Sequence, residues 1–496
     1  MSNPDGSVRQ ARARVHAFAD PSAITELQMF GVPFTRGWSR PPFSCASGLT
    51  LACSLSFLAC SGATGSASSP TSRAAYAHSA SPIAARAEVD STVDPRRTVL
   101  ERRAYVRAVL AHNPSIESAR QGWRAALARV RQSGGFDDPM LDLGLAPLSI
   151  GSSKAPFGYE VGISQRLPWF GKRELESSAA AAEANASKSD FEALRRELAL
   201  SALILYDQYF IAVRSIEINR QHVELMRAMR DAATAQFRAG RASAQDPLQA
   251  EAELAHLEHD AVVLAAQREV TVAQMNELLH RSPELPLPPP VAELPLPLLP
   301  NASKAPELEA DAVAQRSEIN AARERARAAQ ARAERAGREY YPDLTLSTSY
   351  NSMWDMPEHR WMVGLGFNLP VQTGRRAGSA DEAEALRAGF ESDAARLSDA
   401  ARTQVFVALK RLRESAHVIG LFEQRLLPVA REQIDAARAG FTASQNPFMA
   451  LVAAERNLRS VELDYQVARA ECDRHRAELD RALGRIPGLD GQGERP

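Results

Sequence analysis

The sequence lacks several features that would place it in a common class of protein. Its 59 Lys and Arg residues nearly balance its 60 Asp and Glu residues, so the formal net charge of -1 offers no basic surface for nucleic acid. No stretch after residue 60 approaches the roughly 20 apolar residues that a membrane-spanning helix requires. If the chain crosses a membrane, we expect it to do so with β-strands.

Cysteine is scarce, and its placement argues against a disulfide framework. Three of the 4 cysteines lie near the N-terminus, at positions 45, 53 and 60, and Cys472 stands alone in a helical segment. The apolar residues 49–59 follow Arg36 and Arg40, which is typical of an export signal. The first 28 residues make the segment before the apolar run unusually long for such a signal, so Met29 is an alternative start. We assign residues 1–60 to this signal.

Cys60 closes a run, Phe57-Leu-Ala-Cys60, that resembles a bacterial lipoprotein cleavage site. In such a site the cysteine becomes the lipidated first residue of the mature protein. The alternative is an ordinary cleaved signal in which the cysteine is fortuitous. Residues 61–94, rich in Ser and Ala, are predicted to be a flexible tether.

Sequence motifs of enzymes are also missing. Gly171-Lys172 lacks the upstream Gly and the following Ser or Thr of a phosphate-binding loop. Gly364-Leu-Gly366 lacks the third Gly of a dinucleotide fingerprint, because Leu369 stands in that place. No nucleophile elbow or metalloprotease helix motif occurs. We therefore expect neither an enzyme nor a bound cofactor.

A long internal repeat is the main positive feature of the sequence. The run from Val161 to Lys172, VGISQRLPWFGK, returns with one insertion as VGLGFNLPVQTGR, which ends at Arg375. Ile116 matches Ile319 at an offset of 203 residues, and an offset of 204 continues the match toward the C-terminus. A register held over most of the chain indicates that a whole supersecondary unit has been duplicated.

Each repeat contains two segments in which apolar and small or polar residues alternate, as in strands. The four predicted strands are about 139–149, 158–168, 343–351 and 360–370. Such alternation fits a sheet that lies on a core or a transmembrane barrel. The strand lengths of about ten residues and the aromatic residues at the strand ends favour the barrel. Four strands cannot close a barrel, whose usual minimum is about eight, so we expect the chain to oligomerise.

Long helical segments follow both hairpins. Residues 172–239 contain neither Gly nor Pro, and 68 residues of continuous helix would extend about 100 Å. Repeat 1 (95–281) is predicted to have an initial helix, the two strands, this long helix and a return helix at 247–281. Repeat 2 (305–486) has its long helix at 379–442, with a kink near Pro428, and a return helix at 447–484. A Pro-rich linker (282–304) separates the repeats, and 487–496 form a tail.

This arrangement resembles the TolC-type outer-membrane efflux channels, the outer membrane factors, over roughly residues 95–486. The junction Leu167-Pro-Trp-Phe-Gly-Lys172 is most similar to the heavy-metal and multidrug RND-associated lipoprotein branch. The resemblance implies a mainly α protein with a small membrane β portion. It implies a homotrimer in which a 12-stranded barrel in outer-membrane lipid is continued by a periplasmic α-helical barrel. It also implies passive export of small molecules, drugs or metal ions, with a periplasmic adaptor (membrane fusion) protein and an inner-membrane pump.

Two groups of residues are candidate functional sites. The strand-to-helix junctions comprise Pro168, Gly171, Lys172, Pro370, Gly374 and Arg375, with both glycines expected to permit the change of backbone direction. The resemblance places the gate and the adaptor contact at the hairpin tips, at Gly240, Arg241, Asp246, Phe441, Ser444, Gln445 and Asn446. Asp246 matches an acidic gate residue of the family and Phe441 an aromatic one. Asn446, Ala450 and Ala453 stand where TolC carries an Arg and two Asp, which argues against strong cation selectivity.

Two other interpretations concern metal ions and the absence of a pore. Glu253, His256 and Asp260 lie at helical spacing and could bind a metal ion, although a solvated helix face explains them as well. Met353, Met356 and His359 in a predicted turn have the same two interpretations. We expect no metal site. The alternative to a channel is a periplasmic coiled-coil adaptor or scaffold, which would be soluble and lack a pore.

Overall fold

The computed structural model describes residues 98–151, 153 and 156–489, all within one of two compact units of the chain, Ser68–Pro496. The export signal, Cys60 and the whole of the tether lie outside these residues. Repeat 1 contains α3 (Arg102–His112), α4 (Pro114–Ser133), β1 (Met140–Leu145), β2 (Tyr159–Leu167), α5 (Lys172–Arg238) and α6 (Gln245–Leu278). Repeat 2 contains α7 (Ala305–Gln315), α8 (Ser317–Arg338), β3 (Leu344–Asn351), β4 (Trp361–Phe367), α9 (Thr373–Leu421), α10 (Leu427–Thr442) and α11 (Phe448–Ala482).

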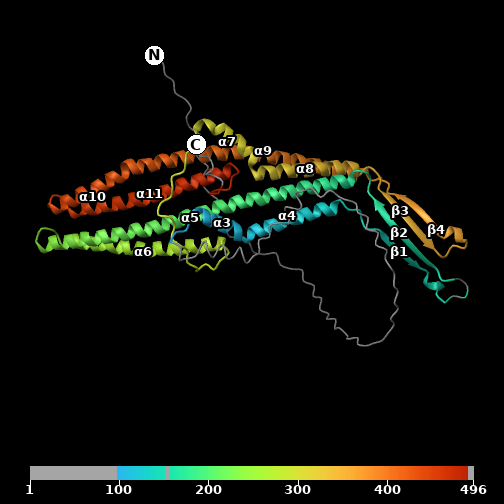
Figure 1. The fold of residues 1–496 in the computed structure, drawn as a ribbon, viewed down its shortest axis with the longest axis horizontal. Helices are drawn as coiled ribbons and strands as arrows, with labels where there is room; N and C mark the ends of the chain where they lie inside the picture. The colour runs from blue at the N-terminus through green and yellow to red at the C-terminus, as the bar shows by residue number, and fades with distance from the viewer. Residues whose placement is uncertain (1–97, 152, 154–155, 490–496) are drawn as a thin grey trace, which may run out of the picture. The chain divides into compact units, whose positions relative to one another are not determined.

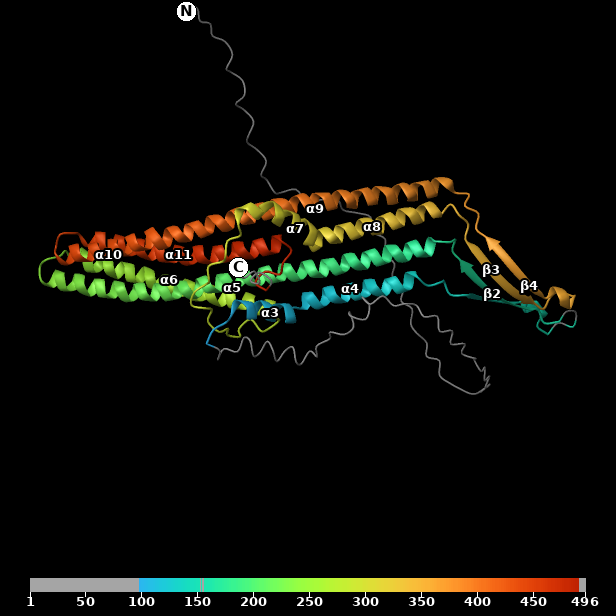
Figure 2. The same cartoon turned by 45° about the horizontal axis from the view of Figure 1, so that its top comes forward.

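The four strands form one antiparallel sheet in the order β1-β2-β3-β4 (Figure 1). The two hairpins meet where β2 pairs with β3, from Glu160 opposite Asn351 to Leu167 opposite Leu344. In each repeat the chain therefore leaves the helices along the first strand, β1 or β3, and returns to them along the second, β2 or β4. The sheet lies at one end of the helices, and the α5–α6 and α10–α11 tips lie at the other (Figures 1 and 2).

The helices next to the sheet repeat the order of the strands. Helix α4 packs on α5, α5 packs on α8, and α8 packs on α9. The contacts between α5 and α8 join the two repeats, as the pairing of β2 with β3 does in the sheet. The duplicated sequence has thus produced two similar halves joined along one continuous boundary, the β2–α5/β3–α8 seam.

Helix α5 is continuous over 67 residues, which corresponds to about 100 Å. It contains one 18-residue window with a mean hydropathy of 1.2, apolar enough by length and composition to cross a membrane. Our expectation that no such stretch follows residue 60 was therefore too strict. In that window, 56% of the residues are buried inside the protein, which is typical of a core helix.

The Pro-rich linker is an ordered part of the middle of the molecule. Leu100 N donates to Pro289 O at 2.7 Å, and Tyr206 Oη donates to Leu100 O at 2.7 Å. Val291 N in turn donates to Tyr206 Oη at 3.2 Å. Leu287 and Leu294 of the linker are buried in the same apolar cluster as α3, α5 and part of α11. The linker therefore binds to α5 although only its end, Ala302–Lys304, forms a short 3-10 helix.

Several element bounds differ from the predicted ones. The strand predicted at 139–149 ends at Leu145, because Pro147 lacks an N–H and begins a 3-10 turn, Pro147–Ser149. The second long helix begins at Thr373 rather than at 379. The kink expected near Pro428 is a π-helical turn, Phe422–Leu426, that directly precedes α10. The initial helix of each repeat is interrupted, at Asn113 and at Arg316.

Candidate functional site

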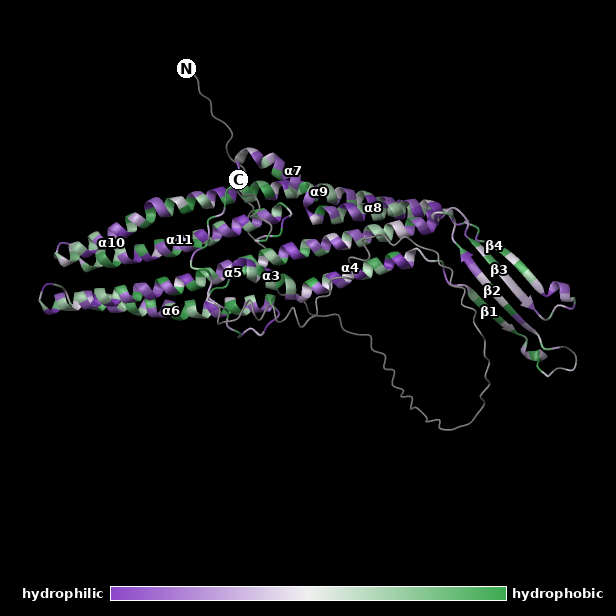
Figure 3. Ribbon diagram, in the orientation of Figure 1, coloured by the Kyte–Doolittle hydropathy of each residue, from purple (hydrophilic) through white to green (hydrophobic). Residues whose placement is uncertain are grey.

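The register of the sheet sorts its side chains into an apolar and a polar face. Directly paired residues share a face, so Leu143, Val161 and Tyr350 lie on one face in neighbouring strands. That face carries Leu141, Leu143, Leu145, Tyr159, Val161, Ile163, Leu167, Leu344, Leu346, Tyr350, Trp361, Val363, Leu365 and Phe367, together with the polar Gln165 and Thr348. The opposite face carries Asp142, Gly144, Glu160, Gly162, Ser164, Arg166, Thr345, Ser347, Ser349, Gly364 and Gly366, together with the apolar Met140 and Met362. Hydropathy accordingly changes sign repeatedly along the strands (Figure 3).

The apolar face is not covered by any other described part of the chain. Leu143 is 69% exposed and Val363 is 81% exposed, although both occupy the middle of a strand. Exposed apolar surface of this extent marks a membrane or protein interface. The outer edges of β1 and β4 also have no neighbouring strand among the described residues. A sheet with two open edges and an exposed apolar face is incomplete as a single copy.

Aromatic residues lie at both ends of the sheet. At the end next to the helices, Trp169 stacks on Tyr341 with ring centroids 5.6 Å apart and an interplanar angle of 8°. At the far end, Tyr350 contacts Trp361 edge to face at 5.4 Å. Two bands of aromatic residues that flank an apolar strip are typical of strands that cross a bilayer.

The first strand-to-helix junction is held by a buried ion pair. Lys172 begins α5 and is 4% exposed, and its Nζ lies 2.8 Å from Oδ1 of Asp343, the residue before β3. Arg166 Nη2 donates to the other carboxylate oxygen at 2.6 Å, and Trp169 N donates to Oδ1 at 3.0 Å. Burial raises the pKa of Asp343, but the hydrogen bonds from Lys172 and Arg166 outweigh this effect and hold it at about 2. The carboxylate thus joins the end of β2 to the start of β3.

Gly171 is required at this junction because of its backbone conformation. Its φ of 78° lies in the left-handed region that glycine adopts without strain. A Cβ atom placed there would lie 1.4 Å from Nη1 of Arg338, which donates to Phe170 O at 3.2 Å, so the flexible end of that side chain would have to move. The backbone conformation therefore disfavours a larger residue.

The second junction does not have the same geometry. The inserted residue starts α9 at Thr373, so Gly374 lies inside the helix, has no positive φ and meets no atom within 4 Å of its ideal Cβ position. Our expectation that Gly374 permits the change of backbone direction was therefore wrong. Arg375, which matches Lys172, is exposed. Phe170, two residues after Pro168, and the residues on either side of Pro370 are exposed as well.

Both hairpin tips end in the same turn. After α5, Gly240 N donates to Phe237 O and Arg241 N donates to Gln236 O. After α10, Ser444 N donates to Phe441 O and Gln445 N donates to Gly440 O, which is the same Schellman pattern. Gly240 has a φ of 68° and Ser444 a φ of 56°. The repeats therefore keep the backbone of the tip although the residue at its left-handed position differs.

The predicted tip residues differ in exposure. Gly240, Arg241, Ser444, Gln445 and Asn446 are exposed, and Asp246 is partly exposed in the first turn of α6. A carboxylate in that position is favoured by the helix dipole. Phe441 is 6% exposed and packs edge to face on Phe448 at 5.3 Å. In this structure Phe441 supports the packing of the hairpin and does not form part of its surface.

Arginine–carboxylate pairs join the two hairpins behind the tips. Arg456 of α11 binds Glu253 of α6 through two hydrogen bonds, one of 2.9 Å and one shorter. Arg459 lies 3.2 Å from Asp260. The hydrogen bonds from Arg456 lower the pKa of Glu253. Among the described residues no group of three or more His, Cys, Asp or Glu side chains could hold a metal ion. Glu253 and Asp260 thus pair with arginines of α11, whereas His256 is exposed.

A buried histidine joins α5 to α11. His222 is 3% exposed, with Nδ1 2.8 Å from Glu455 and Nε2 3.1 Å from Glu462. Arg431 of α10 lies 3.9 Å from Glu462. Burial lowers the pKa of His222, but its hydrogen bonds to the two glutamates outweigh burial and raise it to about 9. The imidazolium is therefore a charged link between the repeats at neutral pH.

Sequence reasoning missed the partners in these contacts. Asp343, His222 and Arg456 were not among the candidate residues. One signal was available for Asp343, because its equivalent in the first repeat is the apolar Met140. A charge that appears in one repeat only, at the start of a strand, indicates a contact that is made once per chain.

These features define a class of protein. An amphipathic antiparallel sheet with open edges and aromatic bands at both ends, continued by one helix of about 100 Å, is typical of a protomer of an oligomeric β-barrel with a helical extension. Such a protomer contributes part of a conduit.

Comparison with known proteins identifies the family. The family model for outer membrane efflux proteins matches residues 105–280 and 308–485, so the chain belongs to that family. The matched segments fall in the two repeats, and the protein is an outer-membrane channel component of an efflux system. No curated protein sequence matches the chain.

Solved structures share the fold. The chain is similar to CusC, with a TM-score of 0.67 and 18% identity over 79% of this chain and 94% of CusC. It is similar to VceC of Vibrio cholerae, with a TM-score of 0.65 and 18% identity over 77% and 95% of the two chains. For MtrE of Neisseria gonorrhoeae the TM-score is 0.64, with 20% identity over 79% and 90%. VceC is described as an outer membrane protein and MtrE as an outer membrane channel, and the CusC structures concern transmembrane channel formation.

Proposed function

We propose that three copies of this chain form one passive channel across the outer membrane and the periplasm. Three four-stranded sheets would give a barrel of 12 strands, with the apolar face toward lipid and the polar face toward a water-filled lumen. The observation that carries the proposal is the four-stranded sheet with one exposed apolar face and two open edges. The unpaired backbone N–H and C=O groups of the open edges become hydrogen-bonded when copies pair edge to edge, as a lipid environment requires.

The helical end provides the contact with the rest of the export system. The tips at Gly240 and Ser444 are exposed at the opposite end from the sheet. We propose that these tips bind a periplasmic adaptor protein and that an inner-membrane pump supplies the cargo and the driving force. The lumen side chains are small or polar, which suits passage of small molecules, drugs or metal ions rather than tight binding.

Cys60 is proposed as a lipid anchor at the outer membrane. Its residue run resembles a lipoprotein cleavage site, and the cysteine is the residue that would carry the lipid. Metabolic labelling with radioactive palmitate tests this directly. Labelled wild-type protein and an unlabelled Cys60→Ser variant are expected, and equal labelling of both would contradict the proposal.

Fractionation of cells tests the channel against the scaffold alternative. The channel should be recovered in the outer-membrane fraction as an oligomer that dissociates to monomers on heating in detergent. A protein that is soluble and monomeric after removal of the signal would support the scaffold instead. Asp246→Lys should then shift the ion selectivity of the purified channel toward anions, because the residue lies beside the proposed aperture. Unchanged selectivity would show that Asp246 does not line the lumen.

A further inference from the structure

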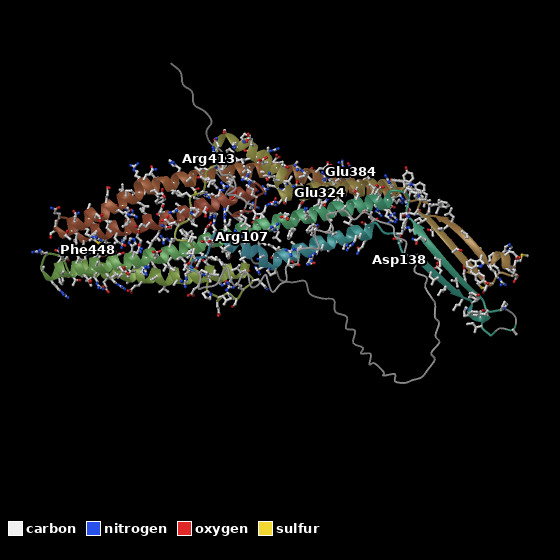
Figure 4. All side chains as sticks on the ribbon, in the orientation of Figure 1. Arg107, Asp138, Glu324, Glu384, Arg413 and Phe448 are labelled. Atoms are coloured by element: carbon white, nitrogen blue, oxygen red, sulfur yellow. The ribbon has the colours of Figure 1, made fainter. Side chains whose placement is uncertain are left out.

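The two open edges of the sheet carry opposite charges that have no partner among the described residues. Arg375 follows β4, and Asp138 precedes β1. Both are exposed, and no hydrogen bond or ion pair holds either side chain in the part of the chain that the structure describes. Asp138 lies where the sheet meets the helices (Figure 4). These residues therefore belong to the two open edges of the protomer.

The seam inside the chain provides a template for what these edges do. At the β2–β3 boundary, Lys172 at the start of α5, five residues after the end of β2, binds Asp343 directly before β3. Along the helices the polarity is reversed, because Arg332 of α8 pairs with Glu183 of α5 at 3.0 Å and Arg325 pairs with Asp190 at 2.5 Å. Where the strands meet the helices, the internal seam thus joins a cation that follows a returning strand to an anion that precedes an outgoing strand.

The outer edges repeat this topology. Strand β4 returns to the helices as β2 does, and β1 leaves them as β3 does, so β4 of one copy and β1 of another can pair antiparallel. Arg375 matches Lys172 at an offset of 203 residues. Asp138 lies two residues before Met140, the equivalent of Asp343, and the long arginine side chain can span this shift.

The surface of α9 next to β4 is also open to packing by another helix. A groove of about 640 Å³ between α8 and α9 is lined by apolar and charged side chains, among them Leu369, Val371, Arg375, Glu382, Leu386 and Phe390. The equivalent groove between α4 and α5, of about 740 Å³, is lined on one side by Arg332 and Arg335 of α8, the helix that packs on α5. The order α4-α5-α8-α9 leaves only α4 of a second copy to occupy the same position beside α9.

We infer that Arg375 of one copy binds Asp138 of the next copy, and that this ion pair fixes the β4–α9 edge of one protomer on the β1–α4 edge of another. The occupant of this edge is a second copy of the chain. The inference rests on the proposed oligomeric channel and names the contact that closes it. The pair would repeat at every boundary between copies, as the Lys172–Asp343 pair repeats within every copy.

Charge exchange tests the inference in the full-length protein. The measurement is the temperature at which the detergent-solubilised oligomer dissociates. Arg375→Glu and Asp138→Lys should each lower it by about 5 °C, and the double variant should recover most of the loss. Arg376→Glu is the matched control, since Arg376 already donates to Glu339 O within the chain at 2.7 Å. Combining it with Asp138→Lys should give no recovery.

Chemical crosslinking provides an independent readout. In a Cys472→Ser background, Arg375→Cys and Asp138→Cys together should yield covalent dimers and trimers with a short bis-maleimide, and each single cysteine should not. An oligomeric parent protein with no rescue and no crosslink would overturn the inferred contact while leaving the channel in place. A monomeric parent protein would overturn the proposed function itself.

Discussion

The buried carboxylate of Asp343 gives the most specific test of how the sheet is attached to the helices. Replacing Asp343 with asparagine keeps the size of the side chain and removes its charge. The ammonium of Lys172, which is 4% exposed, would then keep the carbonyl of Tyr341 at 3.0 Å and the carboxylate of Glu339 at 3.7 Å. Arg166 would lose its bond of 2.6 Å.

The size of the effect follows from two estimates. Breaking one partner of a buried ion pair costs about 3–5 kcal/mol in proteins. The fall in the pKa of Asp343 from 3.8 to about 2 corresponds to about 2 kcal/mol of stability at neutral pH. Arg166 is 58% exposed and adds little, so we expect a loss of about 2–3 kcal/mol. Because the folded-state pKa is lowered, this contribution is present above about pH 4 and is lost as the pH falls toward 2.

Urea unfolding of protein refolded in lipid vesicles measures this loss at pH 7 through tryptophan fluorescence. Trp169 donates its backbone N–H to Asp343 and stacks on Tyr341, so it reports on the junction. Lys172→Met added to Asp343→Asn should recover stability, because it removes the unpaired buried charge. Asp231→Asn, at a side chain that is 71% exposed, is the control and should leave the midpoint unchanged.

Additive effects of the two substitutions on stability would refute the ion pair between Lys172 and Asp343. If Lys172→Met and Asp343→Asn destabilise the protein independently, the two side chains do not act as a pair. A midpoint for Asp343→Asn equal to that of the Asp231→Asn control would also contradict a buried ion pair at the junction.

Three further predictions, made with four substitutions, test other parts of the account. Gly171→Ala should destabilise the protein by about 2 kcal/mol or more, whereas Gly374→Ala should be neutral or stabilising, because Gly374 has open space inside a helix; equal urea midpoints would contradict this. Ser444→Gly should raise the stability of the second hairpin by about 0.5–1 kcal/mol by removing a left-handed serine, measured by amide hydrogen exchange at the tip; faster exchange would argue against it. His222→Gln should flatten the pH dependence of stability. The raised pKa of His222 gives the wild type about 3 kcal/mol below pH 6.5, lost as the pH rises through about 9, and a wild type that is equally stable at pH 7 and pH 9.5 would refute the charged link.

Regular patterns made much of the architecture predictable. Alternation of apolar and small residues located the strands, and the absence of Gly and Pro between 172 and 239 located α5 almost to the residue. Both signals are local, because a strand or a helix expresses its period in consecutive residues. The position of Lys172 at the start of the helix was found for the same reason.

Contacts between distant segments were not predictable in this way. The partner of Lys172 lies 171 residues away, and His222 lies 233 residues from Glu455. Gly374 was misjudged because one inserted residue moved it from the junction into the helix. Phe441 matched a gate residue by position, but its neighbour Phe448 determines that it is buried. Tertiary packing, which leaves no period in the sequence, decided each of these cases.

Conductance across a planar lipid bilayer tests the central claim most directly. The purified, unmodified protein should insert as an oligomer and produce discrete, long-lived current steps of uniform size, because the sheets of several copies close one water-filled barrel. Oligomers without conductance, or a monomeric protein that leaves the bilayer intact, would contradict the account of this chain as one protomer of a channel.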